Sequence, residues 1–218
     1  MIENKGGIER LTKGVSQQGT NYGKIIMDNL SKIYIQLPDH LEKHLGTKRK
    51  GNRFYFRAFG EECCLGPDMI DLSGNPAVEP RGLLISLYAI HANPDPIQLE
   101  PFKSFKDLPG SMPYQGAFHA NSERVLVPRV VKIREEQRAI KEVFNGQDGL
   151  KDSAADFSFI LFPLPKIALY YLFYLPDEEF PASATCLFSA NALSFMPLDG
   201  LADVAEYTSK GIVQLVSK

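Results

Sequence analysis

The chain has no tryptophan, only three cysteines and almost no excess of charge of either sign. Three cysteines among 218 residues cannot form the paired disulfide framework of a small secreted domain, which favours a reducing, cytoplasmic location. Because 24 basic and 26 acidic residues give a formal net charge of −2, no overall charge attracts nucleic acid or an anionic membrane. We therefore expect neither as a partner.

Long apolar runs are also missing. Residues 1–11 mix charged residues with glycine and lack the apolar core of about 7–15 residues that a secretion signal needs. The most apolar stretch, residues 157–175, is interrupted by Pro163, Pro165 and Lys166, whereas a membrane helix needs about 20 consecutive apolar residues. The sequence predicts no transmembrane segment.

The composition, with 44% hydrophobic and 23% charged residues, is that of a globular domain with a substantial core. Residues 1–21 lack a hydrophobic period, so we expect a flexible N-terminal segment there and a single domain over residues 22–218. Three- and four-residue apolar spacing predicts helices over residues 22–37, 80–91, 128–144 and 198–216, with a short helix over 41–45 capped by Asp39 and ended by Gly46.

Alternating or continuous apolar runs predict strands over residues 53–59, 62–65, 69–72, 157–162, 167–175 and 182–189. The fold class is therefore α+β: a single domain whose mainly antiparallel sheet has the C-terminal three-strand meander at its centre, with helices packed on it. Residues 167–175 are apolar on both faces, so both faces of this strand should be covered.

Residues 94–121 form a long proline-rich excursion without a sustained period. Proline reduces the chain entropy lost on ordering, and the aromatic residues of this segment need an apolar surface to cover. We expect residues 102–118 to pack over the C-terminal sheet and to form one wall of the largest pocket. Its lining would be Tyr114, Lys166, Tyr170 and Tyr174.

An acidic run, Asp177-Glu178-Glu179, lies at the predicted tip of the C-terminal hairpin. Such carboxylates can bind a cation, act as acid and base, or keep a strand end soluble. Phe180-Pro181 follows and favours a specified turn in which Phe180 anchors the hairpin to the core. Asp177 and Glu179 complete the candidate ligand-binding residues; Arg81 and Lys166 are further polar residues in apolar surroundings.

No motif for metal binding or catalysis is complete. His40 and His44 have the spacing of two zinc ligands on a helix, but Leu41 replaces the glutamate of the metalloprotease motif and no third ligand is evident. Cys63 and Cys64, being adjacent on a strand, point to opposite faces, so we expect core or half-core cysteines, with a reactive thiol as the alternative. Nucleotide-binding and hydrolase motifs are absent. We expect no metal, no cofactor and no identifiable catalytic residue.

Two stretches carry a resemblance to a known family. They are Phe162-Pro163-Leu164-Pro165 through Asp177-Glu178-Glu179-Phe180-Pro181 to Leu187-Phe188, and Ser104 to Gly110 followed by Tyr114 and Phe118. This pattern resembles DUF3786, a family of domains of unknown function. The chain departs from it at Tyr174, where the family often has tryptophan, and at Ser189, where it commonly has aspartate.

The resemblance implies one domain from Tyr22 onward and an anaerobic bacterial or archaeal setting, beside iron–sulfur and corrinoid one-carbon proteins, but no reaction. Our first hypothesis is a non-catalytic accessory or small-ligand-binding domain with a small-molecule or protein partner. The alternative is an enzyme that uses carboxylates and tyrosines near the C-terminal sheet. A cluster of Tyr114, Lys166, Asp177 and Glu179 around a deep pocket would favour the enzyme; dispersed carboxylates would favour the binding domain.

Overall fold

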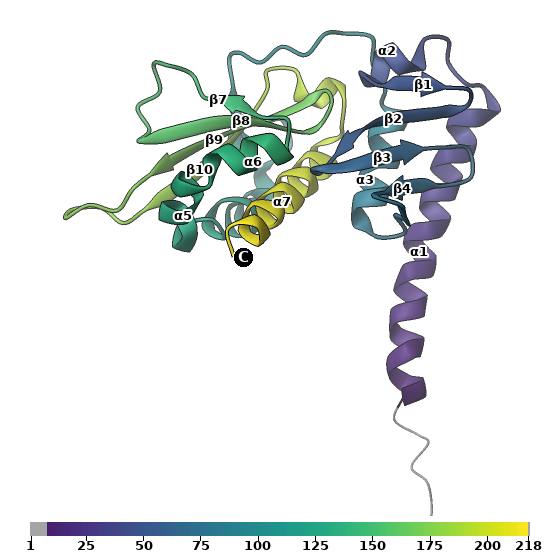
Figure 1. The fold of residues 1–218 in the computed structure, drawn as a ribbon, viewed down its shortest axis with the longest axis horizontal. Coiled ribbons are helices and arrows are strands. Elements are labelled where there is room, and N and C mark those ends of the chain that lie inside the picture. The colour runs from purple at the N-terminus through teal and green to yellow at the C-terminus, as the bar shows by residue number, and fades with distance from the viewer. Residues whose placement is uncertain (1–7, 218) are drawn as a thin grey trace, which may run out of the picture.

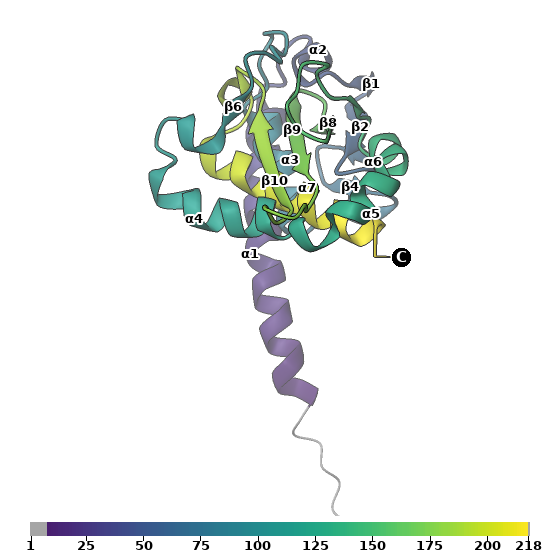
Figure 2. The same cartoon turned by 90° about the vertical axis from the view of Figure 1, so that its left-hand side faces the viewer.

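The computed structural model describes residues 8–217, with side chains from residue 21 onward. Helix α1 spans Ile8–Ile35, so it begins well before the predicted start at Tyr22. Figure 1 and Figure 2 show its first turns projecting beyond the rest of the molecule. A hydrophobic period is needed only where a helix packs on a core, which explains why the sequence pattern missed these turns. Residues 1–7 of the predicted flexible segment lie outside the described residues, and the flexibility of the segment stays a prediction.

The N-terminal half forms a five-stranded antiparallel sheet in sequential order. Its strands are β1 (Lys48–Lys50), β2 (Arg53–Ala58), β3 (Glu61–Leu65), β4 (Ile70–Leu72) and β5 (Asn75–Pro76). Phe54 and Phe56 of β2 are buried, and they alternate with the outward-facing Arg53 and Tyr55. Helices α1 and α3 (Pro80–Ile90) cover the buried face and are joined by a buried hydrogen bond from Asn29 to Ser86 (2.9 Å).

The short helix α2 (Leu41–Leu45) has the predicted bounds, and Gly46 ends it with a φ of 67°. The predicted cap at Asp39 is wrong. His40 is the N-cap residue, with a left-handed φ of 59°, and its carbonyl oxygen accepts the N–H groups of Lys43 and His44. The backbone turn at His40 therefore replaces a side-chain cap.

The C-terminal half forms a second antiparallel sheet in the order β6-β10-β9-β8-β7. Its strands are β6 (Lys103–Ser104), β7 (Gln147–Asp148), β8 (Phe157–Leu164), β9 (Ile167–Tyr174) and β10 (Ser183–Phe188). The antiparallel α+β class and the central three-strand meander are confirmed. The predicted single sheet is wrong, because the strands form two separate sheets. Each sheet ends in very short strands, such as the fully exposed β1 and β7.

Both faces of β9 are covered, as predicted: Tyr170 and Tyr171 are each nearly inaccessible. Helix α7 (Leu198–Leu215) lies against one face, where Ser209 is hydrogen-bonded to the Tyr171 hydroxyl (3.2 Å). The predicted helix over residues 128–144 is divided into α5 (Val130–Glu135) and α6 (Gln137–Val143), because Glu136 leaves helical geometry with a φ of −96° and a ψ of 9°. No helix in residues 8–217 is long and apolar enough to cross a membrane.

The proline-rich excursion packs on the C-terminal sheet as predicted, but it covers both faces. Phe102 packs on the Tyr170 ring, with centroids 4.8 Å apart. After the edge strand β6, Phe105 lies on the opposite face, stacked on Phe118 of α4 (Gln115–Phe118) and 6.0 Å from the Phe188 ring. The excursion therefore wraps around the β6 edge.

Hydrogen bonds at two points join the N-terminal half to the β8–β9 hairpin of the C-terminal sheet. Tyr88 of α3 is almost fully buried; its hydroxyl donates a hydrogen bond to the Leu45 carbonyl (2.7 Å) and accepts one from the Lys166 N–H (3.2 Å). The N–H of Phe59 donates to the carbonyl of Pro163 (2.7 Å). A single cluster of buried apolar side chains continues from one sheet to the other.

Tyr88→Phe should destabilise the protein, because it leaves the Leu45 carbonyl and the Lys166 N–H buried without their partner. We expect a loss of about 1–3 kcal/mol in the free energy of unfolding, measured by urea denaturation. The control is Tyr174→Phe, since Tyr174 is partly exposed and its hydroxyl makes no hydrogen bond within the described residues. Equal losses in the two variants would contradict the role given to the Tyr88 hydroxyl.

Candidate functional site

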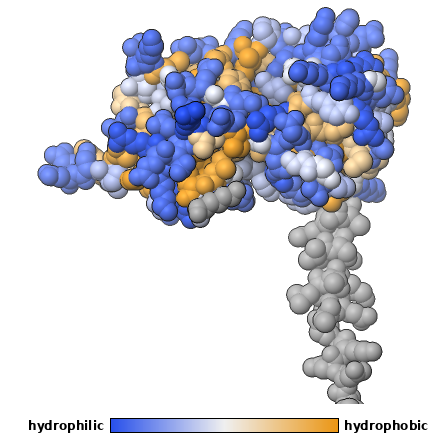
Figure 3. All heavy atoms as spheres, viewed as in Figure 1, coloured by the Kyte–Doolittle hydropathy of each residue, from blue (hydrophilic) through white to orange (hydrophobic). Residues whose placement is uncertain are grey.

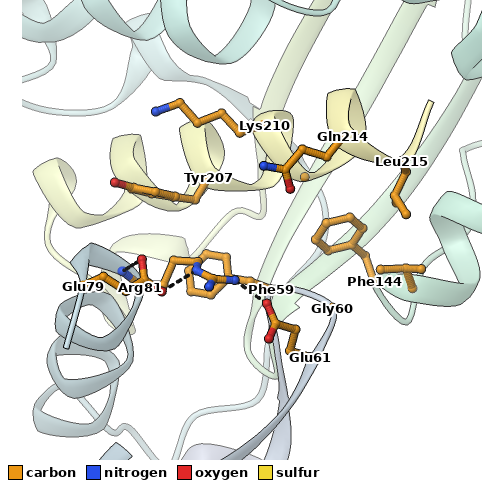
Figure 4. A pocket seen from close by; sticks show the side chains of 12 residues that line it. Phe59, Gly60, Glu61, Glu79, Arg81, Phe144, Tyr207, Lys210, Gln214 and Leu215 are labelled. Carbon is orange, nitrogen blue, oxygen red and sulfur yellow. Dashed lines mark hydrogen bonds and ion pairs between the residues drawn. The ribbon is translucent and has the colours of Figure 1, made fainter. Parts of the chain in front are cut away.

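A cleft of about 530 Å³ opens where the two sheets meet (Figure 4). We call it the inter-sheet cleft. It lies between the β2–β3 turn, the start of α3, the end of α6 and the C-terminal half of α7. Its aromatic walls are Phe59, Phe144 and Tyr207, and its polar lining residues are Glu61, Glu79, Arg81, Lys210 and Gln214.

The β2–β3 turn forms one side of the cleft. Its two residues, Phe59 and Gly60, both have a positive φ, of 52° and 82°. Such a conformation suits a two-residue hairpin loop, but it is rare for a bulky residue such as phenylalanine. Burial of the Phe59 ring holds the turn in this shape, together with the hydrogen bond from the Phe59 N–H to the Pro163 carbonyl. Strained residues of this kind are often found at functional sites.

Arg81 lies at the centre of the polar lining, between two carboxylates (Figure 4). Its Nε donates to Glu79, the N-cap of α3, over 2.6 Å, and its Nη1 donates to Glu61 at the start of β3. Burial alone would lower the pKa of Arg81, but the hydrogen bonds to Glu61 and Glu79 outweigh it and raise the pKa. The guanidinium group is therefore fixed, and its charge is compensated.

Helix α7 supplies the opposite side. Tyr207, Lys210 and Gln214 follow one another at the spacing of one helix face and line the cleft. The Lys210 ammonium is bound to Glu206 (2.6 Å) and lies 5.0 Å from the centre of the Tyr207 ring. Burial raises the pKa of Tyr207. Within the described residues, the Tyr207 hydroxyl and the Gln214 amide form no hydrogen bond, so both can bind a ligand.

Two of the predicted ligand-binding residues, Lys166 and Tyr170, form hydrogen bonds within the protein. Lys166 donates from Nζ to the carbonyl oxygens of Asn93 (2.6 Å) and Asp95 (2.9 Å), and burial lowers its pKa. The Tyr170 hydroxyl accepts the N–H of Leu150 and donates to Ser158, both at 3.3 Å. Lys166 and Tyr170 thus hold loops in place.

The remaining predicted residues are dispersed. Tyr174 and Asp177 line a shallow groove at the hairpin tip, Glu179 is exposed beside it, and Tyr114 is 46% exposed on the 3₁₀ turn before α4. Phe102 packs on the Tyr170 ring, and the predicted pocket between residues 102–118 and the sheet tyrosines stays a prediction. The structure does not bring the six residues together.

The predicted anchoring of the hairpin by Phe180 is also wrong, since this side chain is 66% exposed. Asp177 specifies the turn instead. Its Oδ1 accepts the N–H groups of Glu179 (2.8 Å) and Phe180 (2.7 Å), and its own N–H donates to the Phe180 carbonyl. The hydrogen bonds from Phe180 and Glu179 lower the pKa of Asp177.

Cys63 and Cys186 are buried core residues, and burial raises the pKa of both thiols. Cys64 points to the outer face of the N-terminal sheet, with its Sγ 3.8 Å from Nη1 of Arg53. Among the side chains described here, His40 and His44 included, no group of three or more His, Cys, Asp or Glu residues could hold a metal ion. The expected absence of a metal site stays a prediction.

Sequence reasoning missed most of the inter-sheet cleft. Arg81 stood out as a polar residue in an apolar helix start, and the polar stripe of Tyr207, Lys210 and Gln214 could have been read from its helical spacing. Nothing in the sequence places these two helices opposite the Phe59-Gly60 turn, because that depends on how the two sheets meet.

Gly60→Ala should destabilise the protein more than Gly74→Ala. Both glycines have a φ above 80°, so both substitutions cost about 1–2 kcal/mol of backbone strain. A Cβ at Gly60 would also come within 2.5 Å of Cγ1 of Val143, whereas a Cβ at Gly74 would lie in open space. We expect about 1–3 kcal/mol of additional loss at Gly60 in urea unfolding. Equal losses of stability in the two variants would contradict this prediction, because they would mean that Val143 moves aside without cost.

Residues 38–210 match DUF3786, a domain of unknown function. No curated protein and no solved structure matches the chain. The matched region includes both sheets and the cleft residues from Phe59 to Lys210. Since it covers well over half of the sequence, the chain belongs to the DUF3786 family.

Proposed function

We propose that this domain is a non-catalytic accessory domain that binds a small polar molecule, neutral or cationic, in the inter-sheet cleft. The observation that carries the proposal is the pairing of charges there. Arg81 is held by Glu61 and Glu79, and Lys210 is held by Glu206. Two cations, Arg81 and Lys210, and two carboxylates, Glu61 and Glu79, line the cleft, and Glu206 holds Lys210 from beside it. The site therefore has no spare positive charge with which to attract an anion.

The shape and lining of the cleft support a ligand of modest size. Its volume of about 530 Å³ falls within the range of small-molecule sites. The rings of Phe59, Phe144 and Tyr207 offer apolar and aromatic contact, and the Tyr207 hydroxyl and Gln214 amide offer hydrogen bonds. An aromatic or aliphatic molecule with one polar or cationic end would satisfy both kinds of surface.

The enzyme hypothesis required a cluster of Tyr114, Lys166, Asp177 and Glu179 around a deep pocket. These residues lie apart, and Lys166 is bound to backbone carbonyls, which favours the binding domain. The anaerobic, bacterial or archaeal setting and the cytoplasmic location stay predictions. They rest on the family resemblance and on the cysteine content.

Three probes of nearly equal shape test the charge preference: tyramine, tyrosol and 4-hydroxyphenylacetate, which are cationic, neutral and anionic. At a concentration about ten times the Kd, binding should raise the melting temperature by roughly 3–5 °C, since it adds about 1.4 kcal/mol of stability. We expect this shift with tyramine, a smaller one with tyrosol and none with 4-hydroxyphenylacetate.

Glu61→Gln should remove the preference for tyramine over tyrosol, because it removes one negative charge from the cleft. The matched control is Glu62→Gln, the next residue of the same strand, whose side chain is 82% exposed outside the cleft. Stronger binding of 4-hydroxyphenylacetate, or an equal effect of both variants, would contradict the proposal.

A further inference from the structure

The hairpin between β9 and β10 carries a second surface, away from the inter-sheet cleft. Its tip projects from the side of the C-terminal sheet and stands out in the space-filling view (Figure 1 and Figure 3). A groove of about 560 Å³ lies on it. We call it the hairpin groove; it is lined by Asp156, Tyr174, Leu175, Asp177, Phe180, Pro181 and Ser183.

The groove presents apolar surface to solvent. Phe180 is 66% exposed and Tyr174 is 36% exposed, and Leu175 and Pro181 belong to the same lining. Phe180 contributes little to the core of this chain, so stability of the fold does not explain an aromatic residue there. Apolar side chains gathered in an exposed groove are typical of an interaction site.

The hairpin groove is fixed before any partner binds. Asp156 accepts the N–H of Leu175 over 2.7 Å, at the end of β9. Asp177 closes the turn through its bonds to Glu179 and Phe180. A partner therefore loses little free energy in ordering this segment.

The charge around the groove identifies the chemistry of the partner. Asp156, Asp177, Glu178 and Glu179 contribute four carboxylates, and residues 174–183 contain no lysine or arginine. Within the part of the chain that the structure describes, none of the four forms an ion pair. Unlike the inter-sheet cleft, this surface has an uncompensated negative charge, which favours a basic partner.

We propose that the hairpin groove docks a basic segment of another protein, in which an apolar side chain flanked by lysine or arginine packs on Phe180 and Tyr174. This interaction goes beyond the proposed ligand binding in the inter-sheet cleft and does not depend on it. The apolar groove supplies the contact area, and the carboxylates select the sign of the partner's charge.

Phe180→Trp gives a direct test, because the chain contains no other tryptophan and position 180 is exposed. The probe is the peptide Lys-Lys-Leu-Lys-Lys, with blocked ends. We expect a blue shift of the tryptophan emission of this variant on titration, with an affinity at least about tenfold higher than for Glu-Glu-Leu-Glu-Glu or Lys-Lys-Gly-Lys-Lys. Adding Glu178→Lys and Glu179→Lys should weaken binding about tenfold, whereas Asp177 is kept because it holds the turn.

Tyr114→Trp, at another exposed position, serves as the control and should not respond. Melting curves of every variant verify that it is folded. The proposal is overturned if the emission of the Phe180→Trp variant does not respond to the basic peptide up to about 5 mM, a Kd too weak for specific docking. It is equally overturned if the acidic or glycine peptide binds as well, or if the emission shifts with protein concentration alone, which would identify a second copy of the chain as the occupant.

Discussion

The buried hydroxyl of Tyr88 links the two halves of the molecule, and the remaining architecture depends on the junction that it stabilises. It binds the last carbonyl of α2 and the N–H of Lys166 in the β8–β9 turn, groups that belong to different halves. The hydrogen bond between Phe59 and Pro163 fixes a second point of the same junction. Between residues 8 and 217 no strand of one sheet pairs with a strand of the other, so these hydrogen bonds and the shared apolar core join the sheets.

The inter-sheet cleft is a consequence of that junction. Glu61 and Arg81 come from the N-terminal half, and Tyr207 and Lys210 come from α7. Neither half alone makes the cleft, and its compensated charges suit a neutral or cationic ligand. The hairpin groove differs in both respects. One hairpin and Asp156 form it, and among the side chains that the structure describes its carboxylates have no ion-pair partner. The two proposals therefore assign these surfaces to two kinds of partner, a small molecule and a basic protein segment.

The sequence predicted the elements well, because the apolar spacing of α7 and the continuous apolar run of β9 reflect local burial. It also predicted that the proline-rich segment covers the C-terminal sheet. It failed where the result depends on contacts distant in the sequence. Lys166 and Tyr170 were predicted as site residues because they are polar groups in apolar surroundings. In the structure they bind loop backbone, and a role in ligand binding stays a prediction. Phe180 was predicted to be buried because it is an aromatic residue next to a proline in a turn. It is exposed because the hairpin tip projects from the sheet, which the local sequence does not show.

The most direct test of the central claim is to map tyramine binding by NMR, using the backbone amide signals of the full chain. Binding in the inter-sheet cleft should shift the amides of Gly60, Arg81, Gly211 and Gln214, which line it from both halves. The amides of residues 174–183 in the hairpin should not move, because they belong to the separate groove. Shifts confined to the hairpin, or to one half of the molecule, would contradict a ligand site built at the junction of the two sheets.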